Sequence, residues 1–293
     1  MALKAVAPEV VPVGKPKFMI SGASGSGKTT FALNFPKPYL IDTEGGATGP
    51  QYRKKLIEVG GAYFGKEQGS QDFDAVNAEL KALATTKHEY KTLILDSFSA
   101  LYNFEAARAE EKVGNDFGKD KKEANRPTRQ LMQWIEKIDM TIALICHKKD
   151  KWARKGGADL AYDGTTFDGY DKLEYFLDLW IETEKRGPVR NFIVKKSRIE
   201  AFPEGDRFPL DYSKFSELYG KSVIERPAEA IILATPEQVA TVKGLLEVVK
   251  VGPEDVAGWL KRANVDGFEE MTNETITKLI AFLSKKLEAV AKR

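Results

Sequence analysis

Eight residues near the N-terminus, GASGSGKT at Gly22–Thr29, match the pattern G-x-x-x-x-G-K-S/T in full. Glycines at this spacing let the backbone curl so that successive N–H groups point at phosphate oxygens. A helix that follows adds the positive end of its dipole. The segment follows a short apolar run, Phe18–Ser21, and precedes a helical pattern at Thr29–Phe35. This is the context that a phosphate-binding loop requires.

The motif predicts a nucleotide site that takes ATP with Mg²⁺. Lys28 is expected to reach the β- and γ-phosphates, and the Thr29 hydroxyl is expected to ligate Mg²⁺. The alternative is a glycine-rich turn without a ligand, which the flanking strand and helix disfavour. The residues expected to bind the nucleotide are Gly22, Ser24, Gly25, Ser26, Gly27, Lys28, Thr29 and Thr30.

Apolar runs alternate with helical patterns along the next part of the chain. Such fully apolar strands indicate an α/β fold with a mostly parallel twisted sheet that is covered on both faces. The expected helices are Asp72–Thr85 and Arg126–Met140. The expected strands are Pro38–Asp42, Lys91–Asp96, Thr141–His147, Phe176–Thr183 and Val189–Lys196.

The last part of the sequence has a different pattern. Thr235-Pro236-Glu237-Gln238 is typical of a helix start, with Thr as N-cap and Gln in the capping-box position. Further helix starts follow at Gly252 and Thr272, and no strand pattern appears after about Thr235. We therefore expect a core at residues 1–226 and a small all-helical domain at residues 227–293.

Composition excludes several classes of protein. The 45 Lys and Arg residues against 43 Asp and Glu give a net charge of +2, which excludes a uniformly basic nucleic-acid-coating protein but allows local basic loops. One cysteine, Cys146, excludes a disulfide framework, and with two histidines it argues against a zinc cluster. No apolar run reaches the roughly 20 residues of a membrane span. We expect a cytoplasmic protein without a membrane partner.

Carboxylates stand where two predicted strands end. Asp96 closes one strand, and Glu44 follows another in Asp42-Thr43-Glu44-Gly45-Gly46. The carboxyl ends of parallel strands meet beside the phosphate crevice of an open α/β sheet. Asp96 is therefore expected to hold Mg²⁺ through water, and Glu44 to orient the attacking water. The alternatives are that Asp96 caps the Ser97 turn and that Glu44 lies in an ordinary surface turn.

Five motifs follow one another in an order that resembles the RecA-type recombinase core. They are GASGSGKT, YLIDTEGG, TLILDSFSAL, ALICHKK and VKKSR, and the resemblance covers about Lys17–Leu210. More narrowly, the order is similar to the short phage RecA-like proteins of single-strand annealing and recombination. The resemblance implies a RecA-like P-loop core, Glu44 as the base and Asp96 as the Mg²⁺-linked carboxylate. It also implies a homo-oligomer, a ring or a filament, and the host cytoplasm as the location of a phage-encoded chain.

The resemblance assigns three more residues. His147 falls on a polar sensor position that RecA usually fills with Gln, and its alternative role is a hydrogen bond to backbone. Lys196 and Arg198 fall where RecA-type filaments carry basic residues that complete the neighbouring subunit's ATP site. Alternate residues of a strand point the same way, so both could face one γ-phosphate. Their alternative is an ordinary solvated strand end.

RecA-type cores contact single-stranded DNA through two loops, here expected at about Glu110–Arg126 and Lys148–Tyr170. The stretch from Lys148 to Gly157 carries a local charge of +4 around Trp152. Cations neutralise phosphates and an aromatic ring stacks on bases, although a basic solvated loop is the alternative. The nucleic-acid candidates are Lys119, Lys121, Lys122, Arg126, Lys148, Lys149, Lys151, Trp152, Arg154 and Lys155.

The sequence thus predicts a Mg²⁺·ATP-binding, single-stranded-DNA-binding recombination or annealing protein with DNA-stimulated ATP hydrolysis. Three alternatives stay open: an AAA-type replicative helicase loader, an ATP-switched binding module with little turnover, and a nucleotide kinase. A kinase needs a lid with clustered arginines, whereas the segment after His147 is rich in Lys and Gly with an interleaved Trp. The helical tail could dock on a replication or single-strand-binding protein, or only stabilise the chain.

Overall fold

The computed structural model describes residues 5, 12–114, 118–154 and 160–291. The described strands are β1 (Lys17–Gly22), β2 (Pro38–Asp42), β3 (Ala62–Phe64), β4 (Thr92–Asp96), β5 (Thr141–Arg154), β6 (Leu160–Phe167), β7 (Leu179–Arg186), β8 (Val189–Ser197) and β9 (Arg207–Pro209). The described α-helices are α1 (Lys28–Ala32), α2 (Pro50–Glu58), α3 (Phe73–Thr85), α4 (Phe98–Val113), α5 (Lys119–Lys137), α6 (Leu173–Phe176), α7 (Tyr212–Tyr219), α8 (Lys221–Glu225), α9 (Pro236–Val249), α10 (Pro253–Ala263) and α11 (Asn273–Ala291).

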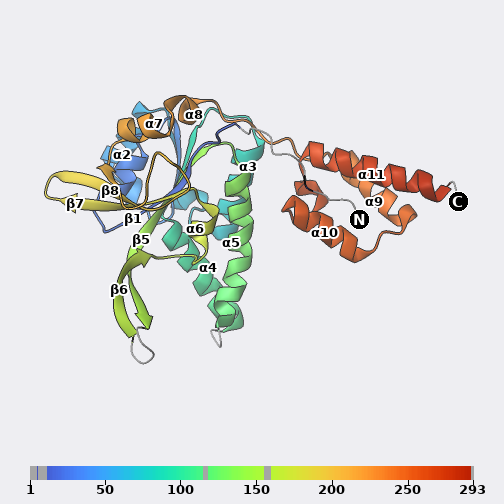
Figure 1. Cartoon of the computed structure of the whole chain (residues 1–293), viewed down its shortest axis with the longest axis horizontal. Helices are drawn as coiled ribbons and strands as arrows, with labels where there is room; N and C mark the ends of the chain where they lie inside the picture. Colours follow the sequence, from blue (N-terminus) through green and yellow to red (C-terminus); the bar gives the residue numbers. More distant parts are fainter. Residues whose placement is uncertain (1–4, 6–11, 115–117, 155–159, 292–293) are drawn as a thin grey trace. The chain divides into compact units, whose positions relative to one another are not determined.

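Within the described residues the strands form one sheet, in the order β3-β2-β4-β5-β1-β7-β8-β9, with β6 paired to β5 (Figure 1). The pairs β1–β5, β1–β7, β2–β3, β2–β4 and β4–β5 are parallel. Only the outer pairs, β7–β8, β8–β9 and β5–β6, are antiparallel among the strands described. The predicted fold class, an α/β core with a mostly parallel sheet, is confirmed.

One face of the sheet is packed by helices α1, α2, α7 and α8. Alternate residues of the central strands point to this face, as Phe18 and Ile20 of β1 do. They meet Phe31 of α1 and Phe215 of α7, and all four side chains are at most 1% exposed. The rings of Phe18 and Phe215 lie 5.0 Å apart. This core fixes the turn between β1 and α1, where the glycine-rich motif lies.

The chain divides into two compact units. The first comprises Met1–Val76, Glu89–Thr128 and Asp139–Ala228, and the second comprises Asn77–His88, Arg129–Ile138 and Glu229–Arg293. The second unit has a core of its own around Val242, Ile276 and Leu283. Its helix α9 begins with the predicted capping box, since the Thr235 side chain accepts from the Gln238 N–H. No helix in the described parts of the chain is both long and apolar enough to span a bilayer.

In their described residues, both segments predicted as DNA loops contain regular structure. The first lies mostly in α5, which begins at Lys119 rather than Arg126 and carries Pro127 inside it. The run Lys119–Ala124 contains good helix formers, and Glu123 pairs with Lys112 of α4. These factors extend the helix ahead of the proline. Four nucleic-acid candidates therefore lie on an exposed helix surface: Lys119, Lys121, Lys122 and Arg126.

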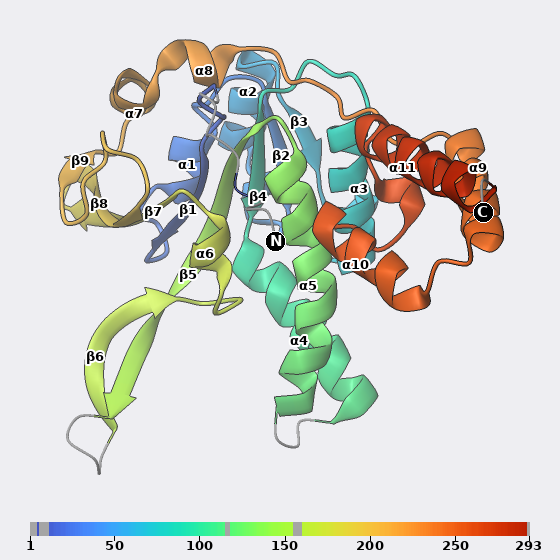
Figure 2. The same ribbon diagram turned by 45° about the vertical axis from the view of Figure 1, so that its right-hand side comes forward.

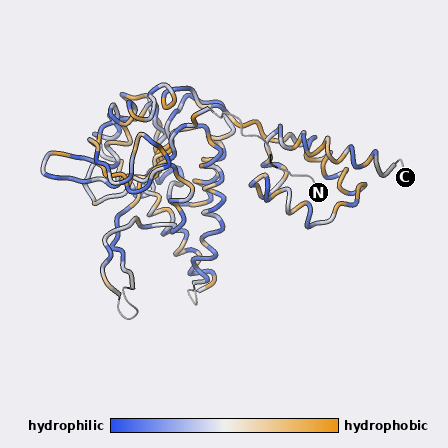
Figure 3. The backbone as a smooth tube through the Cα atoms, viewed as in Figure 1, coloured by the Kyte–Doolittle hydropathy of each residue, from blue (hydrophilic) through white to orange (hydrophobic). Residues whose placement is uncertain are grey.

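The second predicted loop is a β-ribbon. Strand β5 continues past the edge of the sheet to Arg154 and pairs with β6, from Lys148↔Phe167 to Arg154↔Leu160. Figure 2 shows this ribbon extending beyond the sheet, and it is mostly hydrophilic where it leaves the sheet (Figure 3). The β-branched and aromatic residues of Tyr162–Phe167 favour the paired strand. The resemblance to RecA-type cores predicts a loop here, and this prediction is wrong for the described part of the segment.

Candidate nucleotide-binding site

The glycine-rich motif forms the turn between β1 and α1. Gly22 has φ +151°, and a Cβ there would lie 1.9 Å from Thr183 Oγ1, so the turn requires glycine at this position. The buried Ser26 hydroxyl is 2.6 Å from the same Thr183 oxygen and ties the loop to β7. The ammonium of Lys28 lies inside the loop and donates to the carbonyl oxygens of Gly22 (2.9 Å) and Ala23 (3.0 Å). Burial lowers the pKa of Lys28.

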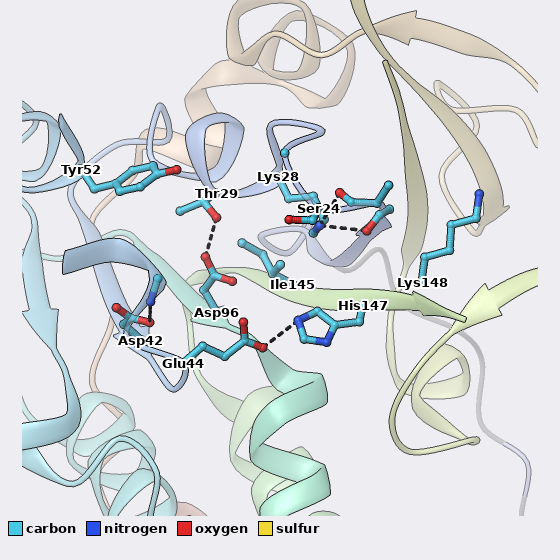
Figure 4. Close-up of a pocket in the computed structure, with 14 residues that line it drawn as sticks. Ser24, Lys28, Thr29, Asp42, Glu44, Tyr52, Asp96, Ile145, His147 and Lys148 are labelled. Atoms are coloured by element: carbon cyan, nitrogen blue, oxygen red, sulfur yellow. Dashed lines mark hydrogen bonds and ion pairs between the residues drawn. The ribbon is translucent and has the colours of Figure 1, made fainter. Parts of the chain in front are cut away.

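Thr29 and Asp96 meet at the base of the pocket, as expected for a Mg²⁺ corner. The Thr29 hydroxyl donates to Asp96 Oδ2 at 2.6 Å (Figure 4). Burial raises the pKa of Asp96 to about 6, with smaller contributions in the same direction from Asp42 and Glu44, while the Thr29 hydrogen bond opposes the rise. Hydroxyl and carboxylate oxygens are the ligands that Mg²⁺ prefers. The residues present therefore fit a Mg²⁺ ion accompanied by nucleotide phosphates.

The side chains of Glu44 and His147 meet across the pocket. His147 Nε2 lies 2.7 Å from Glu44 Oε1, and the Ser97 hydroxyl donates to the same oxygen at 2.5 Å. His147 is the last residue of β5 that pairs with β1, opposite Gly22. Its ring contacts the carboxylate rather than the backbone. The structure thus brings the proposed base and the proposed sensor together (Figure 4).

Asp42 is a site residue that the sequence analysis did not assign. It is 1% exposed, and its carboxylate accepts the N–H groups of Gly45 (2.8 Å), Gly46 (3.1 Å) and Ala47 (2.9 Å). The Tyr63 hydroxyl also donates to it, at 3.0 Å, and burial together with this bond raises the pKa of Tyr63 to about 12. Asp42 therefore shapes the turn that carries Glu44. The spacing Asp-x-x-Gly-Gly, typical of an Asx turn, was the available signal.

These residues line one pocket of about 590 Å³, which is in the range of small-molecule sites. Its walls include Tyr52, Ile145 and Lys148 in addition to the predicted residues. Lys148, predicted as a nucleic-acid contact, thus lies at the nucleotide pocket. A second cavity of about 340 Å³ shares Gly25 and Tyr52 with the first. It is also lined by Thr30, Asn34, Arg190 and Leu210.

Lys196 and Arg198 lie away from this pocket. Strand β8 runs antiparallel to β7, with Lys196 opposite Trp180 and Ser197 opposite Leu179. Leu179 pairs with Phe18 at the start of β1, so these residues lie at the opposite end of the strands from the P-loop. The Lys196 ammonium donates to the Leu177 carbonyl, and Arg198 donates to the Tyr175 carbonyl at 2.7 Å. Burial and the charge of Arg198 lower the pKa of Lys196. Neither residue joins its own chain's site, and their action on a neighbouring subunit stays a prediction.

The β5–β6 ribbon carries the predicted aromatic residue Trp152 and, opposite it, Tyr162. Trp152 is 58% exposed and Tyr162 is 54% exposed; they face each other across the ribbon with ring centroids 5.9 Å apart. Lys149 pairs with Asp168 (3.2 Å) and Lys151 with Asp163 (3.3 Å). Arg154 ends β5, and Lys155 lies outside the described residues. The ribbon therefore presents cations beside a solvent-facing aromatic pair.

Comparisons with known proteins assign the chain to a family. The chain matches the family model AAA_24, described as an AAA domain, over residues 14–208. The chain belongs to this AAA domain family. No curated protein matches the chain. Among solved structures, a crystal structure of the RadB recombinase is similar with 19% identity and a TM-score of 0.42, covering 66% of this chain and 84% of that chain.

The match to the AAA domain includes every element that builds the nucleotide pocket. It begins before β1 and extends into β9, so the P-loop, Asp96, His147 and the β5–β6 ribbon all fall inside it. Helices α9, α10 and α11 fall outside it. The predicted site residues therefore lie within the matched range, and the helical tail follows it.

Proposed function

We propose that this AAA domain protein binds Mg²⁺·ATP and single-stranded DNA and hydrolyses ATP when DNA occupies the β5–β6 ribbon, as a RecA-like recombination or annealing protein. The observation that carries the proposal is the Glu44–His147 pair. His147 ends the part of β5 that belongs to the central sheet, and the ribbon starts at the next residue, Lys148. The His147 side chain thus connects the proposed base, Glu44, with the first residue of the proposed DNA-binding ribbon.

The chain's own groups provide each part of a phosphoryl-transfer site. The loop N–H groups and Lys28 would hold the phosphates, and Thr29 and Asp96 would hold Mg²⁺, which neutralises phosphate charge when bound. Glu44 would orient a water molecule and accept its proton. The second cavity, beside Thr30 and Arg190, suits the nucleoside because it adjoins the loop and is lined by apolar, amide and guanidinium groups.

The ribbon would bind the DNA. Bases stack on aromatic faces without regard to sequence, and lysines neutralise the backbone, so exposed Trp152 and Tyr162 beside Lys149 and Lys151 suit a single strand. The exposed lysines of α5 would extend this contact. The proposal includes a homo-oligomer in which Lys196 and Arg198 act on a neighbour's nucleotide, and a replication or single-strand-binding protein as a partner of the helical tail.

A second candidate is an ATP-switched binding protein with little turnover, such as a helicase loader. It is favoured by the two hydrogen-bonding partners of Glu44 Oε1, Ser97 and His147. A carboxylate oxygen occupied in this way is a weaker base until a partner moves. Under the main proposal, DNA at the ribbon moves His147 and frees this oxygen. Under the second candidate, DNA does not move His147, and the Glu44 oxygen stays occupied.

The test is the variant His147→Ala, with His88→Ala as the matched control because His88 contacts the Leu83 carbonyl away from the pocket. We expect His147→Ala to bind ATP and labelled single-stranded DNA like the wild type but to lose DNA stimulation of hydrolysis. His88→Ala should keep it. Unchanged stimulation in His147→Ala would contradict the proposed link between ribbon and base.

A further inference from the structure

Lys148 occupies a position beside the nucleotide pocket. Strand β5 runs parallel to β1, and their last paired residues are His147 and Gly22, so Lys148 follows directly beside the first residue of the P-loop. It lines the same pocket as Ala23, Ser24 and Lys28. Figure 4 shows Lys148 beyond Ser24, on the side of Lys28 away from Tyr52. In this view His147 lies between Lys148 and Glu44.

The ammonium of Lys148 is held by a buried carboxylate. Its Nζ lies 2.7 Å from Glu182 Oε1, and the Glu182 side chain is 9% exposed. The other oxygen of Glu182, Oε2, is buried and accepts no hydrogen bond from the described residues. Lys195 lies 3.6 Å from this oxygen, with its ammonium 5.9 Å from the centre of the Trp180 ring. Two lysines thus share one buried carboxylate.

This sharing lowers the cost of moving Lys148. A buried carboxylate that loses its only cation is strongly destabilised. Glu182 would keep Lys195 after Lys148 leaves, and the 3.6 Å separation leaves room for Lys195 to close to hydrogen-bond distance. A terminal phosphate entering beside Ser24 carries more negative charge than a carboxylate and presents several acceptor oxygens. It would therefore compete with Glu182 for the Lys148 ammonium.

We infer that Lys148 is a second phosphate-binding cation of this site, which passes from Glu182 to the terminal phosphate of a nucleoside triphosphate. The inference rests on the proposed nucleotide binding and adds the discrimination of triphosphate from diphosphate. Lys28 lies within the loop, where both nucleotides would place phosphate. Lys148 lines the same pocket and follows His147, which contacts the proposed base Glu44, and that base would act at the terminal phosphate that only a triphosphate carries. Glu182 and Lys195 act as positioning residues.

The test measures the dissociation constants of the non-hydrolysable ATP analogue AMP-PNP and of ADP, both with Mg²⁺ and without DNA, by displacement of a fluorescent ADP. We expect Lys148→Met to weaken AMP-PNP about tenfold, because a hydrogen bond to a charged group is lost, and to change ADP less than twofold. Lys214→Met is the matched control. Lys214 is also ion-paired, to Glu217 at 3.1 Å, and its side chain is 35% exposed against 33% for Lys148.

A second variant tests the transfer itself. Glu182→Gln removes the competing carboxylate charge, so AMP-PNP binding should tighten severalfold while ADP binding stays unchanged. Wild-type melting temperatures in both variants establish folding. If the wild-type protein binds both nucleotides and Lys148→Met leaves the ratio of the AMP-PNP and ADP dissociation constants unchanged, the inference about Lys148 is overturned and the proposed function is not. Wild-type protein that binds neither nucleotide would instead overturn the proposed function.

Discussion

At the scale of single residues, the buried position of Asp96 in the pocket shifts its pKa. Asp96 ends β4 inside the sheet, where burial raises its pKa to about 6. A carboxyl whose pKa is higher in the folded chain than in the unfolded chain stabilises the fold only at low pH. This stabilisation is lost as the pH rises through 6. At neutral pH the ionised Asp96 therefore lowers the free energy of unfolding, which is expected of a residue kept for binding a cation.

Asp96→Asn should separate stability from function. At pH 7.5 we expect the nucleotide-free variant to be more stable by about 1–2 kcal/mol, because the buried charge is gone. The difference should vanish below about pH 3, where the wild-type carboxyl is protonated in the folded and the unfolded chain. Urea unfolding at both pH values measures it. The same variant should lose Mg²⁺-dependent ATP binding, and a variant that is less stable at pH 7.5 would contradict this account.

Glu44→Gln tests the base. The amide keeps the size of the side chain and its contact with Ser97, so ATP affinity should stay within about twofold of wild type. Hydrolysis should fall about a hundredfold or more, because an amide cannot accept the proton of the attacking water. Equilibrium binding and single-turnover hydrolysis report these two quantities. Full hydrolysis by the variant would remove Glu44 from this role.

At the scale of elements, the β5–β6 ribbon is the proposed contact for single-stranded DNA, which a nucleotide kinase would not need. Trp152→Ala should weaken binding of a labelled single-stranded oligonucleotide about tenfold, because base stacking on one aromatic ring is lost. ATP affinity should not change. Tyr175→Ala is the matched control, since Tyr175 is 66% exposed and lies outside the ribbon. Equal losses in the two variants would show that the ribbon is not the binding element.

The sequence predicted the central strands well but predicted the antiparallel pairing of the outer strands poorly. Pro38–Asp42 is confirmed residue for residue as β2, because an all-apolar run between turn residues has few alternatives. The ribbon was missed because the resemblance to RecA-type cores places a DNA-binding loop there, although cross-strand pairing was available to Trp152 and Tyr162. Lys196 and Arg198 lie at the end of the sheet that β8 reaches after its antiparallel turn from β7. The spacing of residues in the sequence does not determine the direction of this strand.

At the scale of the whole molecule, the second unit has its own core and should unfold without the sheet. Leu283 is fully buried in that core. Leu283→Ala should lower the free energy of unfolding of this unit by about 2–5 kcal/mol, whereas truncation of its neighbour Phe282, which is 46% exposed, should cost less. Hydrogen exchange should show faster exchange in α9 and α11 and unchanged exchange in β1 and β4. Equal loss of protection in the sheet would contradict separate units.

The central claim joins the ATP pocket to the DNA contact through His147. Its most direct test is steady-state ATP turnover of the full chain, alone, with duplex DNA and with single-stranded DNA, with Lys28→Ala as the blank. The account predicts that single strands raise turnover well above the basal rate and that duplex DNA does not. Turnover that stays at the Lys28→Ala level while single-stranded DNA is bound would contradict it and leave the ATP-switched binding protein as the function.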